Sequence, residues 1–513
     1  MGVIVETDRT TMRILYILLL AVIIGMWCFY SPATLWLIIL SISLLHIFSL
    51  IFKEKKQKRF IIVICTFALV LRFILSLGNY YGSWVKGIGA DFIGDARAYS
   101  ASGQYIAEVL TEERATNVDG NEFQWVVSLR EIYKGLLPGL QYRVDVFARY
   151  IGLIYSSFGY NPVLIKFINS LLSVLSSILL FILAKKFFSI KVANITLALT
   201  SFWPSILIWS TSGMKEPLSI FLITLNVFIY LNYFKDSINN LGFVLLLLIS
   251  VVSNYAISLI LIIIFCLFRI CKKDNFKFSL YNKLILPLLG LIIIRFSFDS
   301  VRLLRSHLFP ILFFSFLLSR IISLNKKALI SLLILVCLGL FYFSSANKFN
   351  IKEFYNRSTH VLIDHQSNQQ QSARTAYKIY PDKYYASKLN ISFPDLVFSY
   401  LKGLSYILFS PFPFRGFFNS SNLLALVQSI IFYLLVPFTT LGIFISLRYK
   451  WRDMSIFIFF IFFTLSLYAL VEGNIGTLFR HRDVATFFLL MFTAIGIDRL
   501  FEFSLLKEVL KYK

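Results

Sequence analysis

The sequence predicts an all-α polytopic membrane protein, and three observations support that prediction. Hydrophobic residues make up 58% of the 513 residues and charged residues only 15%, whereas soluble proteins carry about 25% charged residues. The apolar residues gather in runs long enough to cross a hydrocarbon core, which takes about 20 residues per helix. The charged residues gather between the runs, in short basic clusters and two long polar loops. These features exclude a soluble protein.

The apolar runs predict about 13 to 14 transmembrane helices, each of roughly membrane-spanning length. The predicted spans cover residues 14–30, 34–52, 60–78, 161–184, 192–209, 217–234, 241–253, 254–270, 281–297, 308–323, 328–344, 424–447, 454–471 and 484–500. No small-residue cleavage site separates the first run from the second, so we expect an anchor rather than a signal peptide.

Basic clusters predict the orientation of the chain. The densest cluster, residues 53–59, follows the second span, and cytoplasmic loops are enriched in Lys and Arg. Alternation from this point places further basic clusters at 185–191, 269–273, 326–327 and 448–452 on the same side. Both termini are then cytoplasmic, and a bacterial plasma (inner) membrane is the expected location.

Four regions follow from this topology. They are an N-terminal helix pair with its basic cytoplasmic loop at 1–59, a transmembrane core at 60–345, a second large extracytoplasmic loop at 346–423, and C-terminal helices at 424–513. The core contains the first large extracytoplasmic loop at about 79–160. Apolar residues at helical spacing in 98–110 and 142–155 predict interfacial helices there. Residues 348–394 are polar with little periodicity, which favours a mobile lid or a partly disordered segment.

Composition also limits the partners. The five cysteines lie in or at the ends of apolar runs and form no CxxC motif, so no disulfide framework or metal site is predicted. The net charge of +24 is scattered between spans, which suits anionic headgroups and lipid-linked phosphates better than nucleic acid.

Two carboxylates lie close to the outer surface, because Asp91 and Asp95 follow the third span by about a dozen residues. A carboxylate in this place can take the proton from an acceptor hydroxyl or amine that attacks an activated sugar. Asp95 also directly precedes a predicted helix, where Asp often serves as the N-cap. The two roles do not exclude each other.

A set of motifs surrounds Asp95 in a recognisable order. Asp95-x-x-x-Tyr99 is followed by a helix that ends in Ile106-Ala107-Glu108. Further matches lie at residues 158–162, 168–172, 184–188, 203–210 and 215–217. Over roughly residues 60–270 the chain resembles C-type (GT-C) integral-membrane glycosyltransferases of the protein-mannosyltransferase and aminoarabinose-transferase branch.

The resemblance implies a GT-C-like fold and a hexosyltransferase-type reaction with inversion at the sugar carbon. It implies a polyprenyl-linked sugar as donor and an acceptor on the outer face, with Asp95 as the catalytic base. Many members have a second acid directly after that Asp, whereas this chain has Ala96. Asp91 or Glu108 could substitute, and a divalent cation as cofactor stays open.

Lys215 and Glu216 lie in a short predicted loop, where charge close to the bilayer is costly unless it is paired or used. Lys215 could bind the donor's phosphate, or it could pair with Glu216 and extend to lipid headgroups. Arg97 and Tyr99 are further candidates for supporting the site.

The last predicted outer loop, residues 472–483, contains Arg480, His481 and Arg482 on the face where positive charge is disfavoured. These side chains are predicted to bind the donor's phosphate or pyrophosphate; the alternatives are headgroup anchoring or pairing with nearby acids. Weaker candidates of the same kind are Arg415 and the cluster Arg302, Arg305 and His307.

The leading hypothesis is therefore a membrane glycosyltransferase that acts in cell-envelope polysaccharide or glycoconjugate synthesis, with a glycan, lipid or protein acceptor. A polysaccharide polymerase or ligase of the O-antigen or capsule type is the alternative enzyme. A lipid or oligosaccharide transporter would need ionisable residues inside the spans. In our reading, only Arg295 and Arg320 approach that description.

Overall fold

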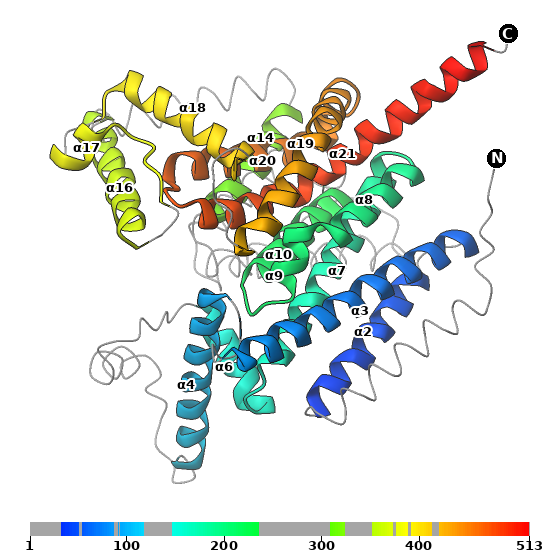
Figure 1. Ribbon diagram of the computed structural model, residues 1–513. Helices are drawn as coiled ribbons and strands as arrows, with labels where there is room; N and C mark the ends of the chain where they lie inside the picture. The colour runs from blue at the N-terminus through cyan, green and yellow to red at the C-terminus, as the bar shows by residue number, and fades with distance from the viewer. Residues whose placement is uncertain are drawn as a thin grey trace, which may run out of the picture. The chain divides into compact units, whose positions relative to one another are not determined.

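The computed structural model describes residues 32–50, 54–86, 91, 93–116, 146–234, 308–323, 351–372, 376–387, 391–412 and 420–511. The regular elements in these ranges are helices, apart from one isolated bridge between Ala376 and Asn474 (Figure 1). Among them, five helices are long and apolar enough to cross a membrane, or up to six if one bent pair is a single span. The prediction of an all-α, multi-pass membrane protein is therefore confirmed for the described residues.

Each of the nine predicted spans that fall on described residues coincides with a helix or with a pair of consecutive helices. These helices are α2 (Pro32–Leu50), α3 (Lys55–Val85), α7 (Pro162–Phe187), α8 (Ile190–Phe202) with α9 (Pro204–Ser210), α10 (Glu216–Ile229) with the π-helix η2 (Tyr230–Phe234), α14 (Leu308–Ser323), α19 (Ser420–Tyr449), α20 (Trp451–Val471) and α21 (Ile475–Lys511). The predicted spans at 14–30, 241–253, 254–270, 281–297 and 328–344 lie outside the described residues.

The chain divides into two compact units. The first contains residues 1–177 and 201–221, and the second contains residues 178–200 and 222–513.

In the first unit, helices α4 (Gly94–Thr116) and α6 (Val146–Phe158) pack against each other, as Figure 1 shows. A Cβ atom on Gly103 would lie 2.4 Å from Ile151 Cγ2, and one on Gly152 would lie 2.6 Å from Ile106 Cγ2. The two glycines therefore permit the close approach. This pair confirms the helices predicted at 98–110 and 142–155; their interfacial position stays a prediction.

Helix α9 is separated from α8 by a bend of 55° at Trp203 and Pro204. Proline disfavours helical backbone in the residue before it, and Trp203 is extended, with φ −62° and ψ 124°. The break leaves α9 as a helix of only 7 residues, which leads into the turn of residues 210–216 before α10.

In the second unit, α19 and α21 cross at glycines. A Cβ atom on Gly442 would lie 1.8 Å from the carbonyl oxygen of Phe492, and one on Gly496 would lie 1.9 Å from that of Phe438. Small residues of this kind let membrane helices approach closely.

The second large loop differs from the prediction, because it contains α16 (Ile351–Ser372), α17 (Asp382–Ser387) and α18 (Phe393–Phe409). The buried stripe of α16 includes Thr359, Ile363 and Gln366, two of which are polar. A hydrophobic pattern therefore gives little sign of this helix. The Gln366 amide donates to the carbonyl of Glu472, which ties α16 to the turn between α20 and α21.

Candidate functional site

The turn at 210–216 is held in the first unit by polar side chains of α3 and α7. Its carbonyl groups at positions 210, 211, 212 and 214 accept hydrogen bonds from Ser170, Asn79 and Asn169 over 2.8–3.2 Å. Asn169 bonds two of these carbonyls and is itself fully buried. Because a short turn has few bonds of its own, these side chains determine its path.

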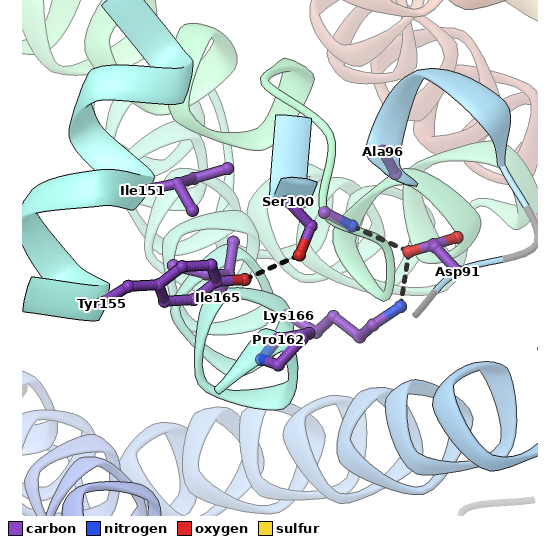
Figure 2. Close-up of a pocket in the computed structure, with 9 residues that line it drawn as sticks. Asp91, Ala96, Ser100, Ile151, Tyr155, Pro162, Ile165 and Lys166 are labelled. Atoms are coloured by element: carbon purple, nitrogen blue, oxygen red, sulfur yellow. Dashed lines mark hydrogen bonds and ion pairs between the residues drawn. The ribbon is translucent and has the colours of Figure 1, made fainter. Parts of the chain in front are cut away.

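Asp91 is the carboxylate that completes this support, and it is only 2% exposed. Its Oδ1 atom accepts from Asn79 Nδ2 at 3.2 Å and from the amide of Ile93 at 3.0 Å. Its Oδ2 atom accepts from the amide of Gly213 at 3.1 Å and from the Lys166 ammonium group (Figure 2). An ionised carboxylate has about four acceptor positions, and all four are used here. The geometry thus favours a structural role for Asp91 over the predicted catalytic one.

Asp95 lies in the first turn of α4, since the helix already begins at Gly94 and the amide of Arg97 donates to the carbonyl of Ile93. The alternative that Asp95 is the N-cap residue therefore does not hold, because the helix starts one residue before it. A carboxylate in this first turn is still favoured by the helix dipole. The side chain is half-buried and remains a candidate for proton transfer.

The structure brings Lys215 to the helix that carries Asp95. The Lys215 ammonium group lies 5.5 Å from the centre of the Tyr99 ring, within the range of a cation–π contact. Residues four apart share a face of a helix, so Asp95 and Tyr99 point to the same side of α4. A Cβ atom on Gly213 would lie 3.7 Å from Ala96, which places the turn directly against the first turns of α4.

The other predicted supporting residues occupy different positions. Glu216 is fully buried in the first turn of α10, and Arg97 is half-buried on α4. Glu108 is exposed and accepts a hydrogen bond from Gln104. At a rise of about 1.5 Å per residue, Glu108 lies about 20 Å along α4 from Asp95. This separation is too large for Glu108 to replace the missing second acid.

A small pocket lies beside the Asp91–Lys166 pair and is also lined by Ser100 and Tyr155 (Figure 2). The hydroxyl oxygens of Ser100 and Tyr155 are 3.0 Å apart. Burial raises the pKa of the Tyr155 phenol. Among the described residues, no group of three or more His, Cys, Asp or Glu is placed to hold a metal ion.

Sequence reasoning missed ionisable residues that lie well inside the predicted spans, among them Arg72 and Lys166. Arg72 of α3 is 0% exposed and Lys166 of α7 is 1% exposed. The prediction that only Arg295 and Arg320 approach an ionisable position inside a span is therefore wrong. The signal was present, because each lies within a predicted span, where a charge is rare. Arg295 itself lies outside the described residues.

The basic cluster at 480–482 belongs to the second unit and lies on a helix, because α21 begins at Ile475. The Asn474 side chain accepts from the amide of Gly476 at 2.9 Å and supports this early start. The prediction that residues 472–483 form a loop is therefore wrong for most of its length. An apolar-run criterion misses helical turns that contain charges.

Arg482 and His481 of the cluster make defined contacts within the protein. Arg482, 2% exposed, donates from Nη1 to three carbonyl groups near the end of α18. Such bonds satisfy the last carbonyls of a helix. His481 lies with Nδ1 2.6 Å from Glu472 Oε1, and its ring stacks on Tyr468 at 4.4 Å. These contacts favour structural roles for both. The Arg480 side chain is half-buried.

The remaining predicted anion-binding residues, Arg415 and the cluster Arg302, Arg305 and His307, lie outside the described residues. No protein-family model matches the chain, and no curated protein matches it. The resemblance to C-type glycosyltransferases therefore stays a prediction from the motifs quoted above.

Proposed function

We propose that this chain is an inverting membrane glycosyltransferase that moves a sugar from a polyprenyl-phosphate-linked donor to an extracytoplasmic glycan, lipid or protein. The observation that supports this proposal is the contact between Lys215 and Tyr99, one helical turn from Asp95. Lys215 thus contacts the helix that carries Asp95, although the two residues lie far apart in the sequence. Transfer from a phosphate-linked donor can use a carboxylate as the base and a cation to stabilise the leaving phosphate.

In this reaction the acceptor oxygen attacks the anomeric carbon as the bond from that carbon to the donor's phosphate oxygen breaks. The phosphate leaves with the electron pair, and the acceptor's proton passes to Asp95. Lys215 offsets the negative charge that develops on the leaving phosphate. Attack from the side opposite the phosphate inverts the sugar carbon.

The position of the site along the chain suits a lipid-linked donor. Asn79, which holds the turn, lies near the end of the candidate membrane span Lys55–Ser83. A phosphate carried on an isoprenoid chain lies at the same level, where the hydrocarbon core meets water. The half-buried side chain of Lys215 extends from a turn at this level.

The direct test is sugar transfer by the purified protein in lipid vesicles. The donors would be a labelled monosaccharide on polyprenyl phosphate and an oligosaccharide on polyprenyl pyrophosphate. Asp95→Asn should lower transfer about 10²–10⁴-fold, as the loss of a general base does, while donor binding is kept. Asp382→Asn, an exposed Asp of α17 in the second unit, is the matched control and should transfer normally.

Full activity of Asp95→Asn would overturn the proposed base. Transfer of only the pyrophosphate-linked oligosaccharide would favour the polymerase or ligase.

The buried Arg72 and Lys166 give one observation that favours the transporter as a second candidate, because intramembrane charges often mark pathways. However, each contacts polar groups of its own unit, as Lys166 does with Asp91. Movement of labelled donor across vesicles that lack an acceptor, without any transfer product, would support the transporter instead.

A further inference from the structure

We infer that Arg72 is a positioning residue that holds the 210–216 turn, and through it Lys215, from inside a membrane-spanning helix. The effect on sugar transfer rests on the proposed function. The contact with the turn does not.

Arg72 is fully buried, and its guanidinium group has three hydrogen-bond acceptors, all neutral. Nε donates to Ser210 Oγ at 3.0 Å, Nη2 donates to Ser173 Oγ at 3.3 Å, and Nη1 donates to the carbonyl of Ala68 at 3.2 Å. Within the described part of the chain, no carboxylate pairs with it. A buried charge without a counterion is costly, and an apolar side chain would be cheaper in α3. What holds the guanidinium group in α3 is therefore its hydrogen bonds to neutral groups, two of which lie on other helices.

Ser210 is the residue through which Arg72 acts. It ends α9 and begins the turn, and it is fully buried. Its carbonyl accepts from Ser170, and its hydroxyl donates to the carbonyl of Leu207 while it accepts from Arg72. Hydrogen bonds thus fix the positions of both the backbone carbonyl and the side-chain hydroxyl of Ser210.

The need for this support follows from the break at Pro204. A helix of 7 residues is too short to be stable by itself, so tertiary contacts must set the direction in which the chain leaves α9. Arg72 sets that direction at position 210, and Asp91 holds the turn at Gly213. Lys215 lies two residues beyond, over the Tyr99 ring.

Backbone amide exchange of the full chain in lipid nanodiscs tests the inference without any substrate. Arg72→Met keeps a long apolar side chain but removes the donors. Exchange at residues 211–215 should become about tenfold faster or more, the effect of losing charge-assisted hydrogen bonds, while exchange in α20 stays unchanged. Arg149→Met removes an exposed arginine of α6 in the same unit and should change neither.

Ser210→Ala provides a milder variant if Arg72→Met does not fold. It should speed exchange in the same residues. The double variant should add little to the effect of Arg72→Met, since both changes remove the hydrogen bond between Arg72 and Ser210. Unchanged exchange at 211–215 in the variants that fold would overturn the inference. Faster exchange spread over the whole chain would also overturn it, because Arg72 would then support the fold in general.

The transfer assay separates this inference from the proposed function. If both hold, Arg72→Met lowers kcat/KM in wild type but not further in a Lys215→Met background, and Arg72→Lys restores part of the loss. A third outcome is faster exchange confined to the turn, with an unchanged rate of sugar transfer. It would support the positioning of the turn by Arg72 and count against phosphate binding by Lys215.

Discussion

Replacing Asp91 by Asn changes one atom of a carboxylate that accepts four hydrogen bonds, and we expect a large loss of stability. The donors are two amide groups of the backbone, the Asn79 side chain and the Lys166 ammonium group. Either orientation of the new amide places its NH₂ group against two of these donors. Lys166, 1% exposed, would also keep its charge without a counterion. Breaking a buried pair in this way costs about 3–5 kcal/mol of unfolding free energy.

Replacing the partner of Asp91, by Lys166→Met, should lower the unfolding free energy by less. Lys166→Met removes only one of the four donors, so Asp91 keeps three hydrogen bonds. The expected loss is about 3 kcal/mol, the lower end of the range for breaking a buried pair, because Asp91 loses its counterion but keeps its other three hydrogen bonds. In the double variant with Asn and Met no charge is stranded, so it should be more stable than the sum of the single losses predicts.

Equilibrium unfolding of the purified variants in mixed detergent micelles measures these differences. The order of stability should be wild type, then Lys166→Met, then Asp91→Asn, with the double variant less destabilised than the two single losses combined. Strict additivity would refute the argument, because it would show that Asp91 and Lys166 do not act as a pair. An unchanged unfolding free energy in Asp91→Asn would refute the geometry of four hydrogen bonds itself.

Three further predictions concern other parts of the chain. Lys215→Met should weaken binding of a polyprenyl phosphate in titration calorimetry by about 1.5–3 kcal/mol, and unchanged affinity would assign Lys215 to lipid headgroups instead. Gly496→Leu should destabilise the protein by about 1–3 kcal/mol or more, because the new side chain meets the Phe438 carbonyl. Gly78→Leu is the control, because open space surrounds Gly78. Equal melting temperatures of the two variants would contradict the tight crossing of α19 and α21. Hydrogen bonds from Tyr384, Lys383 and Ser392 lower the pKa of Asp395 from 3.8 to about 2, so its stabilising contribution to α18 is complete above pH 3.8 and is lost as the pH falls toward 2. Amide exchange at the start of α18, corrected for intrinsic rates, should show this loss in wild type and not in Asp395→Asn.

Helix positions could be predicted well from the sequence, because the signals for them are local. The length of an apolar run matches the thickness of the hydrocarbon core, as it does for α3 and α20. The helices α4 and α6 were also predictable from spacing alone. By contrast, α16 was missed, because its buried stripe is partly polar.

The candidate site could be predicted only in part. Asp95 and Lys215 were found from a resemblance in motifs, and the structure places their segments together. The support beneath them was not predicted, because Lys166 and Asp91 are separated by 75 positions and Arg72 and Ser210 by 138. A single charge barely changes the average hydropathy of a span, so nothing local marks its partner.

The sequence by itself therefore determined the class of the molecule and the positions of most helices that the structure describes. The tertiary structure decided which charges are occupied by internal bonds, such as those of Asp91 and Arg482, and which residues surround the turn that carries Lys215. The physical reason is the range of the two effects. Apolar burial depends on the composition of each segment, whereas a buried polar group is tolerated only when a distant part of the chain brings it a partner.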